Sequence, residues 1–184
     1  FPTMLTAWRW GASPQRSGPL TLIGPPGTKA VLAALATAYG EIVTAPGFPL
    51  AVQELPPGEA IVLADGVRLA ARQVPHTPES VAYSVEHGGR RLVYTGDTAY
   101  DATLGEWAAG CDVLLAECSL PDTLAIPSHL TPRQCGRIAA AASPRRLVLT
   151  HFYPPVEDVD IRAEVAEAFP GEVVLARDGW TIEI

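Results

Sequence analysis

The sequence predicts an α/β fold, in which short apolar strands and amphipathic helices form a layered sheet structure. The segment Arg91–Thr98 begins as an apolar strand and ends in a glycine followed by an acid. Two other apolar runs, Val67–Val74 and Arg146–Thr150, end in the same way before a histidine. A helix with a capping box, starting at Thr131, leads into the second of these runs, as a helix-to-strand unit of an α/β sheet does.

The first forty residues predict a helix, a strand and a second helix. Apolar residues at helical spacing predict a helix over Phe1–Trp10, and the turn-rich segment Gly11–Pro19 predicts a connection. The run Leu20–Ile23 predicts a strand, followed by a glycine- and proline-rich turn. Thr28 is expected to be the N-cap of a helix, with Gly40 just past its end. This turn is not a phosphate-binding loop, because it lacks the Gly-Lys-Ser/Thr ending and its two prolines remove backbone N–H groups.

The next fifty residues predict strands, because the helical period disappears there. The expected strands are Leu50–Leu55, Ala60–Leu63, Val67–Val74 and Val81–Glu86. The segment Glu86–Arg90 carries Gly-Gly and predicts the tip of a hairpin, with His87 in solvent.

The second half of the chain alternates helices and strands. A helix is expected over Asp101–Ala109 and a buried strand over Asp112–Glu117. The loop Ser119–Ser128 contains two prolines and leads to His129. Thr131, with proline next and glutamine three residues on, then begins the capped helix.

The last thirty residues predict a helix and a hairpin. Asp158 or Asp160 is expected to cap a helix with apolar positions from Ile161 to Phe169. The segments Glu172–Ala176 and Trp180–Ile184 are expected to pair as a terminal hairpin.

Composition predicts one domain, residues 1–184, with a substantial core. The chain has 184 residues, of which 48% are hydrophobic, and no apolar run approaches the roughly 18 residues of a membrane span. The net charge of -7 and pI of about 5.0 argue against broad attraction to nucleic acid. Because no membrane span, charged n-region or cleavage site is seen, we expect a cytoplasmic protein. Cys111, Cys118 and Cys135 are an odd number without Cys-x-x-Cys spacing, so we expect buried thiols.

Three metal-competent side chains, His76, Asp97 and His151, each follow a strand. Taken singly, each has a structural explanation: His76 as a turn residue, Asp97 as a helix cap and His151 as a core histidine. Taken together, they predict convergence at one sheet edge, where imidazoles and a carboxylate suit zinc. His129 precedes a helix instead, which suits proton donation to a leaving group better than ligation. Glu117, at another strand end, is expected to be either a structural residue or a group that supports the site.

These residues stand in motifs that resemble the later motifs of the metallo-β-lactamase superfamily, in the branch that contains ribonuclease Z and related phosphodiesterases. The motifs are Pro75-His76, Thr95-Gly96-Asp97-Thr98, Ser128-His129-Leu130-Thr131 and Leu149-Thr150-His151. The resemblance runs from about Leu20 to the C-terminus. It implies that His76 ligates a first zinc, Asp97 bridges two zinc ions and His151 ligates the second. It also implies that His129 assists the leaving group.

The chain departs from this family in two ways. The His-x-His-x-Asp-His motif is absent, and Phe1–Leu5 resembles the segment that follows it, so we expect the N-terminal strands and first metal motif to be missing from this chain. No long Gly/Pro-rich basic arm lies between Gly40 and His76. That absence, together with the acidic pI, disfavours tRNA as the substrate.

The resemblance implies an αβ/βα sandwich and a zinc-dependent phosphodiesterase that uses a metal-bridging hydroxide, with Asp97 and His129 as catalytic residues. Manganese is an alternative to zinc. Alternative functions are cleavage of another ester, such as an aryl sulfate or a lactone, and a metal-free non-catalytic fragment. We expect the 184 residues alone to bind zinc weakly and to lack activity. No membrane partner is expected, whereas an exposed sheet edge allows a homodimer.

Overall fold

The computed structural model describes residues 1–11 and 14–184, which form two compact units, Phe1–Pro56 and Pro57–Ile184. The first unit starts with α1, Pro2–Thr6, which continues as a π-helical turn over Ala7–Gly11. The expected connection Gly11–Pro19 includes residues 12 and 13, which lie outside the described residues.

A two-stranded parallel sheet and a helix form the rest of the first unit. Its elements are β1 (Leu20–Gly24), α2 (Thr28–Tyr39), a 3-10 turn (Gly40–Val43) and β2 (Leu50–Glu54). The Oε1 atom of Glu54 accepts hydrogen bonds from the backbone N–H groups of Gly27 and Lys29, at 3.0 and 2.9 Å. A carboxylate at this position satisfies unpaired donors of the helix start and complements its dipole.

The predicted N-cap of α2 was wrong by one residue. Gly27 occupies the N-cap position with a φ of 98°, a left-handed conformation that glycine adopts without strain. The hydroxyl of Thr28 donates to the carbonyl of Pro25 at 2.7 Å and therefore closes the preceding turn.

The second unit contains a seven-stranded mixed sheet, whose strands lie in sequence order from β3 to β9. The strands β3 to β6 pair antiparallel, and β6 to β9 pair parallel. The strands are β3 (Ala60–Val62), β4 (Arg68–Gln73), β5 (Val81–His87), β6 (Arg90–Tyr94), β7 (Val113–Glu117), β8 (Arg146–Thr150) and β9 (Glu172–Leu175). Short 3-10 turns lie at Ala64–Gly66, Asp122–Leu124 and Pro154–Asp158.

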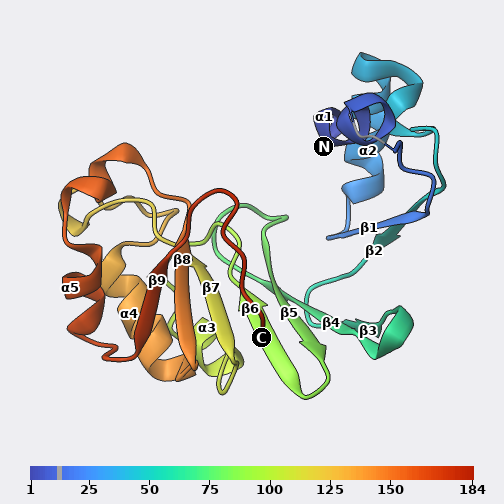
Figure 1. Cartoon of the computed structure of the whole chain (residues 1–184). Coiled ribbons are helices and arrows are strands. Elements are labelled where there is room, and N and C mark those ends of the chain that lie inside the picture. Colours follow the sequence, from blue (N-terminus) through green and yellow to red (C-terminus); the bar gives the residue numbers. More distant parts are fainter. Residues whose placement is uncertain (12–13) are drawn as a thin grey trace. The chain divides into compact units, whose positions relative to one another are not determined.

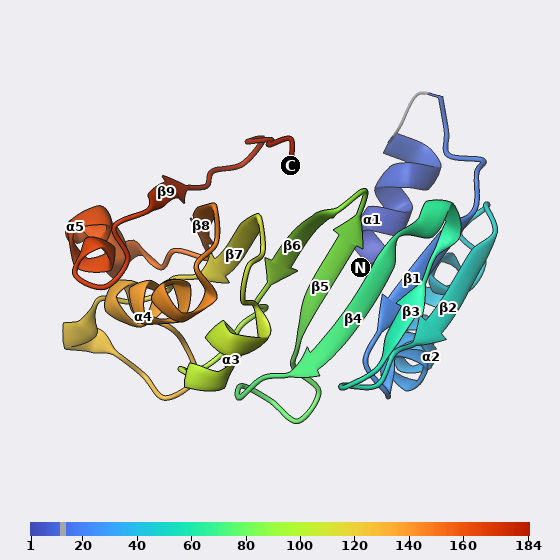
Figure 2. The ribbon, with the colours of Figure 1, turned by 90° about the horizontal axis from the view of Figure 1, so that it is seen from below.

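Three helices lie on one face of the parallel half of this sheet (Figures 1 and 2). They are α3 (Ala102–Trp107), α4 (Pro132–Ala142) and α5 (Ile161–Ala166). Between helices and sheet lies a core of fully buried aliphatic residues, among them Leu114, Ile138 and Leu147. The capping box predicted at Thr131 is confirmed, because its side chain accepts from Gln134 N and Gln134 Oε1 accepts from Thr131 N.

Two glycines set how closely these helices approach. A Cβ atom at Gly105 of α3 would lie 2.8 Å from the carbonyl oxygen of Ile138 in α4. A Cβ atom at Gly136 of α4 would lie 2.7 Å from the carbonyl oxygen of Val165 in α5. Both distances are shorter than a carbon–oxygen contact allows, so α4 is held between two close neighbours only because these positions lack a side chain.

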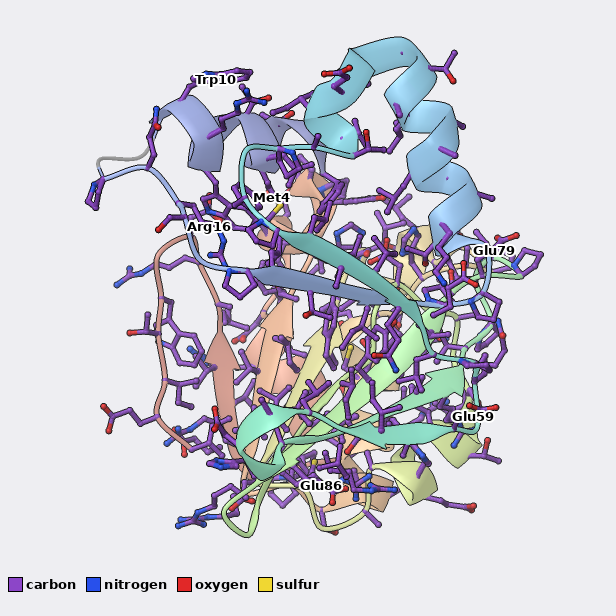
Figure 3. All side chains as sticks on the ribbon, turned by 90° about the vertical axis from the view of Figure 1, so that its right-hand side faces the viewer. Met4, Trp10, Arg16, Glu59, Glu79 and Glu86 are labelled. Carbon is purple, nitrogen blue, oxygen red and sulfur yellow. The ribbon has the colours of Figure 1, made fainter. Side chains whose placement is uncertain are left out.

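The strands β4, β6, β7 and β8 end at the same edge of the sheet, because β4 and β6 are both antiparallel to β5 and β6 to β8 are parallel. Figure 3 labels Glu79, which precedes β5, and Glu86, near its end, at opposite ends of that strand. The predicted site residues follow strands that end on the Glu79 side of the sheet.

The terminal hairpin predicted from the sequence was wrong. The strand β9 pairs parallel with β8, and Trp180–Ile184 is not a strand. The strand β9 is the last strand of the sheet and pairs on one side only, with β8, while Trp180 N closes a turn with the carbonyl of Arg177 at 3.0 Å. Of the two expected caps of α5, Asp160 makes the bond, since its carboxylate accepts from Ala163 N at 3.0 Å.

Candidate functional site

Five ionisable side chains lie in the loops that follow the strand ends at this edge. His76 follows β4, Asp97 follows β6, Glu117 is the last residue of β7, His129 ends the loop after β7, and His151 directly follows β8. Because the four strands end at one edge, their loops place these side chains near one another.

Asp97, His129 and His151 form one cluster, in which one ligand atom from each residue lies within 4.8 Å of the others. The Oδ2 atom of Asp97 lies 3.6 Å from Nε2 of His151, which is too far for a hydrogen bond. The side chain of His151 is 34% exposed, yet its Nε2 atom is buried and has no hydrogen-bond partner among the described residues. A buried polar atom without a partner costs free energy, so this nitrogen fits a ligand position beside the carboxylate.

The donor set of this cluster fits a zinc ion. Imidazole nitrogen and carboxylate oxygen are zinc ligands in proteins, and an unpaired imidazole nitrogen beside a carboxylate is the arrangement that a divalent cation would satisfy. His151 has a positive φ of 63°, which is uncommon for a residue with a side chain. Strained backbone of this kind clusters at functional sites.

His129 is held by a buried carboxylate. Its Nδ1 atom lies 2.9 Å from Oε1 of Glu117, whose side chain is fully buried. Glu117 also accepts hydrogen bonds from Thr98 N at 2.7 Å, Ser119 Oγ at 2.6 Å and Leu130 N at 3.2 Å. Since the carboxylate is an acceptor in these contacts, Nδ1 of His129 donates, and Nε2 is left to face the cluster or the substrate.

His76 lies beside the cluster rather than within it. Its ring centre is 4.9 Å from that of His129, and its Nδ1 atom lies 2.8 Å from the carbonyl oxygen of Ser128. A carbonyl only accepts, so Nδ1 carries the proton and Nε2 of the neutral ring has a free lone pair. Histidines that bind metals usually make such a bond with the opposite nitrogen. The structure thus brings two of the three predicted ligands together, Asp97 and His151, and places the third, His76, next to His129.

The turn that delivers Asp97 depends on glycine. Gly96 has a φ of 62°, and a Cβ atom there would lie 2.9 Å from the carbonyl oxygen of Val81. Any side chain at this position would push the turn away from β5. Burial raises the pKa of Tyr94 at the end of β6, and the negative charges of Asp97 and Glu117 raise it further. Negative charge is therefore concentrated at the site, as a cation-binding site requires.

Sequence reasoning gave Glu117 no definite role and missed Tyr153. Glu117 could be noticed as an acid that ends an otherwise apolar strand, but its four hydrogen bonds depend on tertiary contacts. The ring of Tyr153 lies 5.6 Å from that of His129 and 5.2 Å from that of His151. Its position two residues after His151 was the only available signal.

A hollow of about 1000 Å³ opens beside His76. The side chains that line it are largely apolar or neutral, and they come from the end of β4, from the loops after β4, β6 and β7, and from the start of α3. They are Gln73, Val74, Pro75, His76, Thr77, Pro78, Tyr100, Asp101, Ala102, Pro127 and Ser128. The hollow provides space for part of a small molecule next to the metal-competent side chains.

The three predicted thiols are confirmed as free and buried. Cys135 lies against the site, since its Sγ donates to the carbonyl oxygen of Glu117 at 3.0 Å. Burial raises the pKa of Cys135 well above its ordinary value, and the adjacent Cys118 and Glu117 raise it further. Cys135 therefore packs against the site and does not offer a thiolate ligand.

The fold and this edge define the class of protein, and the chain belongs to the β-lactamase superfamily, whose domain model matches residues 4–152. Within it the chain is a hydrolase of the ribonuclease Z-like branch. It is 30% identical to a ribonuclease Z of Mycobacterium sp. (strain KMS), over 96% of this chain and 70% of that protein. The predicted superfamily, branch and fold are thereby confirmed.

Two solved structures show the same fold. The metallo-β-lactamase fold protein YhfI from Bacillus subtilis matches with a TM-score of 0.76 and 21% identity, over 97% of this chain and 68% of that one. The short form of human tRNase Z matches with a TM-score of 0.70 and 23% identity, over 100% of this chain and 73% of that one.

Proposed function

We propose that this protein is a zinc-dependent phosphodiesterase that acts on small diesters. The observation that carries the proposal is the pair formed by His129 and the buried Glu117, 2.9 Å apart, beside the cluster of Asp97 and His151. A histidine oriented by a buried carboxylate is a proton-transfer group, and the adjacent carboxylate and imidazole are metal ligands. Metal binding and proton donation at one edge are the two requirements of metal-assisted ester hydrolysis.

In the proposed mechanism, Asp97 and His151 hold the metal, and His76 is positioned to add its free Nε2. Zinc bound there would lower the pKa of a water molecule and offset the negative charge on the phosphate oxygens in the transition state. Glu117 fixes the ring of His129 through Nδ1, so that Nε2 delivers a proton to the departing oxygen. The carboxylate also compensates the positive charge of the protonated imidazole.

The loops around the site favour a small substrate over RNA. The loops of residues 74–80, 95–101, 118–131 and 151–160 contain seven Asp and Glu residues and no Lys or Arg. RNA carries one negative charge per nucleotide, and proteins that bind it neutralise several phosphates with basic side chains. A small phosphodiester carries a single negative charge, which the metal site alone can offset.

In the described residues, no helix is long and apolar enough to cross a membrane. We further propose a cytoplasmic location, because three free thiols fit a reducing compartment.

Because the 184 residues alone are expected to bind zinc weakly and to lack activity, the test uses the protein with a His-x-His-x-Asp-His segment restored upstream. Hydrolysis of bis(p-nitrophenyl) phosphate is measured under zinc saturation, with and without the substitution His129→Ala. Loss of the proton donor should lower turnover by roughly 10² to 10⁴ and leave the zinc content, measured by metal analysis, unchanged. The matched control is His87→Ala, because His87 lies by the hairpin tip at the other edge and, among the described residues, its ring bonds only the carbonyl of Asp65.

Loss of zinc together with activity would make His129 a ligand instead of a proton donor. No hydrolysis by the wild-type protein under zinc saturation would contradict the proposed function itself.

A further inference from the structure

Tyr153 is held rigidly next to the metal-competent cluster by its backbone. Its N–H donates to the carbonyl of Ser119 at 3.1 Å, and its own carbonyl accepts from Val156 N at 2.9 Å. Val156 is fully buried in the core, so the segment after His151 is anchored on both sides of Tyr153. A ring held in this way loses little conformational entropy when a ligand contacts it.

The ring of Tyr153 forms a wall of the site. Its plane is inclined by 60° to the imidazoles of both His129 and His151, in an edge-on arrangement. One side of the phenol ring thus contacts the two histidines. The residue is nevertheless 37% exposed, so part of the aromatic surface remains open to a molecule bound at the cluster.

Exposed apolar side chains gather on the loops that carry the site. Large hydrophobic side chains are exposed at seven positions of residues 57–184, and four of these lie on the loops after β6, β7 and β8. The four are Tyr100, Leu124, Ile126 and Tyr153. Exposed apolar groups concentrated around a polar cluster indicate a binding surface with an apolar contribution.

The row of histidines separates two of these surfaces. His76 lines the hollow that also contains Tyr100, while Tyr153 contacts His129 and His151. Adjacent rings in the row lie 4.9 Å and 5.3 Å apart. A phosphodiester has two ester groups that leave the phosphorus in different directions, so one group can enter the hollow while the other reaches Tyr153.

We propose that Tyr153 determines specificity by stacking against a flat, uncharged aromatic group on one ester of the substrate. The inference rests on the proposed function of the same site and narrows its substrate class to monoanionic phosphodiesters that carry an aromatic ring. The ring of Tyr153, and not its hydroxyl group, makes the contact. A basic side chain, which would favour a polyanion, is absent from all four surrounding loops.

The experiment measures binding, so that it does not depend on turnover. Diphenyl phosphate and dimethyl phosphate are both monoanions that differ in their ester groups, and every protein compared also carries His129→Ala, so that hydrolysis of diphenyl phosphate during the titration is slowed. Affinities of the zinc-saturated protein for each are measured by isothermal titration calorimetry for wild type, Tyr153→Ala and Tyr153→Phe. Tyr39→Ala is the matched control, since Tyr39 is 60% exposed and lies in the first unit. Zinc content and circular dichroism show that each variant keeps its metal and its fold.

Wild type should bind diphenyl phosphate more tightly than dimethyl phosphate. Tyr153→Ala should weaken diphenyl phosphate binding by about 3- to 10-fold, the contribution of one aromatic pair, and change dimethyl phosphate binding by less than about 2-fold. Tyr153→Phe and Tyr39→Ala should both resemble wild type.

Equal affinity of wild type for the two phosphates, or an unchanged diphenyl phosphate affinity in Tyr153→Ala, would overturn the inference. An equal loss for both phosphates would do so too, because Tyr153 would then only support the imidazoles. If the aromatic preference is found but bis(p-nitrophenyl) phosphate is not hydrolysed, the proposed hydrolysis fails and the binding role of Tyr153 stands.

Discussion

Replacing Glu117 by glutamine tests whether the buried carboxylate both supports the fold and serves His129. The Oε1 atom of Glu117 accepts from Thr98 N and His129 Nδ1, while Oε2 accepts from Ser119 Oγ and Leu130 N. The amide nitrogen of glutamine must take one of these two positions. It then faces the backbone N–H of either Thr98 or Leu130, and one buried donor loses its acceptor.

The expected magnitude follows from this count. One unsatisfied buried donor costs about 1–3 kcal/mol, which corresponds to a fall in Tm of roughly 2–12 °C for a protein of this size. The position of Oε2 is the less costly one for the amide nitrogen, because the hydroxyl of Ser119 can rotate and accept, and the bond from Leu130 is the longest at 3.2 Å. Glu106→Gln is the control, since it makes the same chemical change at an exposed residue of α3 and should leave Tm unchanged.

The effect on turnover follows from the contact with His129. With the amide oxygen at the Oε1 position the imidazole keeps its hydrogen bond but loses its countercharge, so turnover should fall, by less than the roughly 10² to 10⁴-fold loss caused by His129→Ala. Glu117→Gln combined with His129→Ala should be no slower than His129→Ala alone, because the two residues act as one unit. Melting curves give Tm, and hydrolysis of bis(p-nitrophenyl) phosphate gives turnover, for Glu117→Gln, His129→Ala and the double variant. Full activity in a destabilised Glu117→Gln would refute the catalytic part of this reasoning, and additive losses would show that the two residues act independently.

Two further predictions concern substrate and metal. Bis(p-nitrophenyl) phosphate should be hydrolysed more readily than precursor tRNA is processed, and salt between about 50 and 200 mM should have little effect on this hydrolysis. Efficient cleavage of precursor tRNA that falls steeply with salt would instead support a ribonuclease function. The 184-residue chain should lose zinc during gel filtration, because each catalytic zinc usually takes three protein ligands and the two expected ions would have to share His76, Asp97 and His151. Retention of one equivalent of zinc would show that one ion takes a complete set of ligands from this chain.

The parts of the fold that could be predicted are those that depend on neighbours in sequence. The strands before His76, Asp97 and His151 were predicted because apolar runs and turn residues are local signals. The capping box at Thr131 was predicted for the same reason. Because four strands end at one edge, local predictions of where strands end were sufficient to predict that Asp97 and His151 lie together.

The parts that could not be predicted depend on contacts between distant residues. Trp180–Ile184 has a strand-like pattern, but the choice of β8 as the partner of β9 is a property of the whole sheet. The role of Glu117 likewise requires Thr98 and Leu130 to approach it from two different loops. A carboxylate that ends a strand looks the same in the sequence whether it accepts four hydrogen bonds or none. The expected single domain and the roles assigned to the site residues stay predictions.

The left-handed backbone of His151 has a consequence for how this protein evolves and how it can be engineered. A non-glycine residue held in this conformation carries about 1–3 kcal/mol of strain, and the surrounding bonds of β8 and Tyr153 must offset it. Glycine at residue 151 would relieve that strain and remove the buried nitrogen in one step. Selection for stability alone would therefore drive this residue away from histidine, and a screen for thermostable variants would tend to discard the site unless it also selected for metal binding.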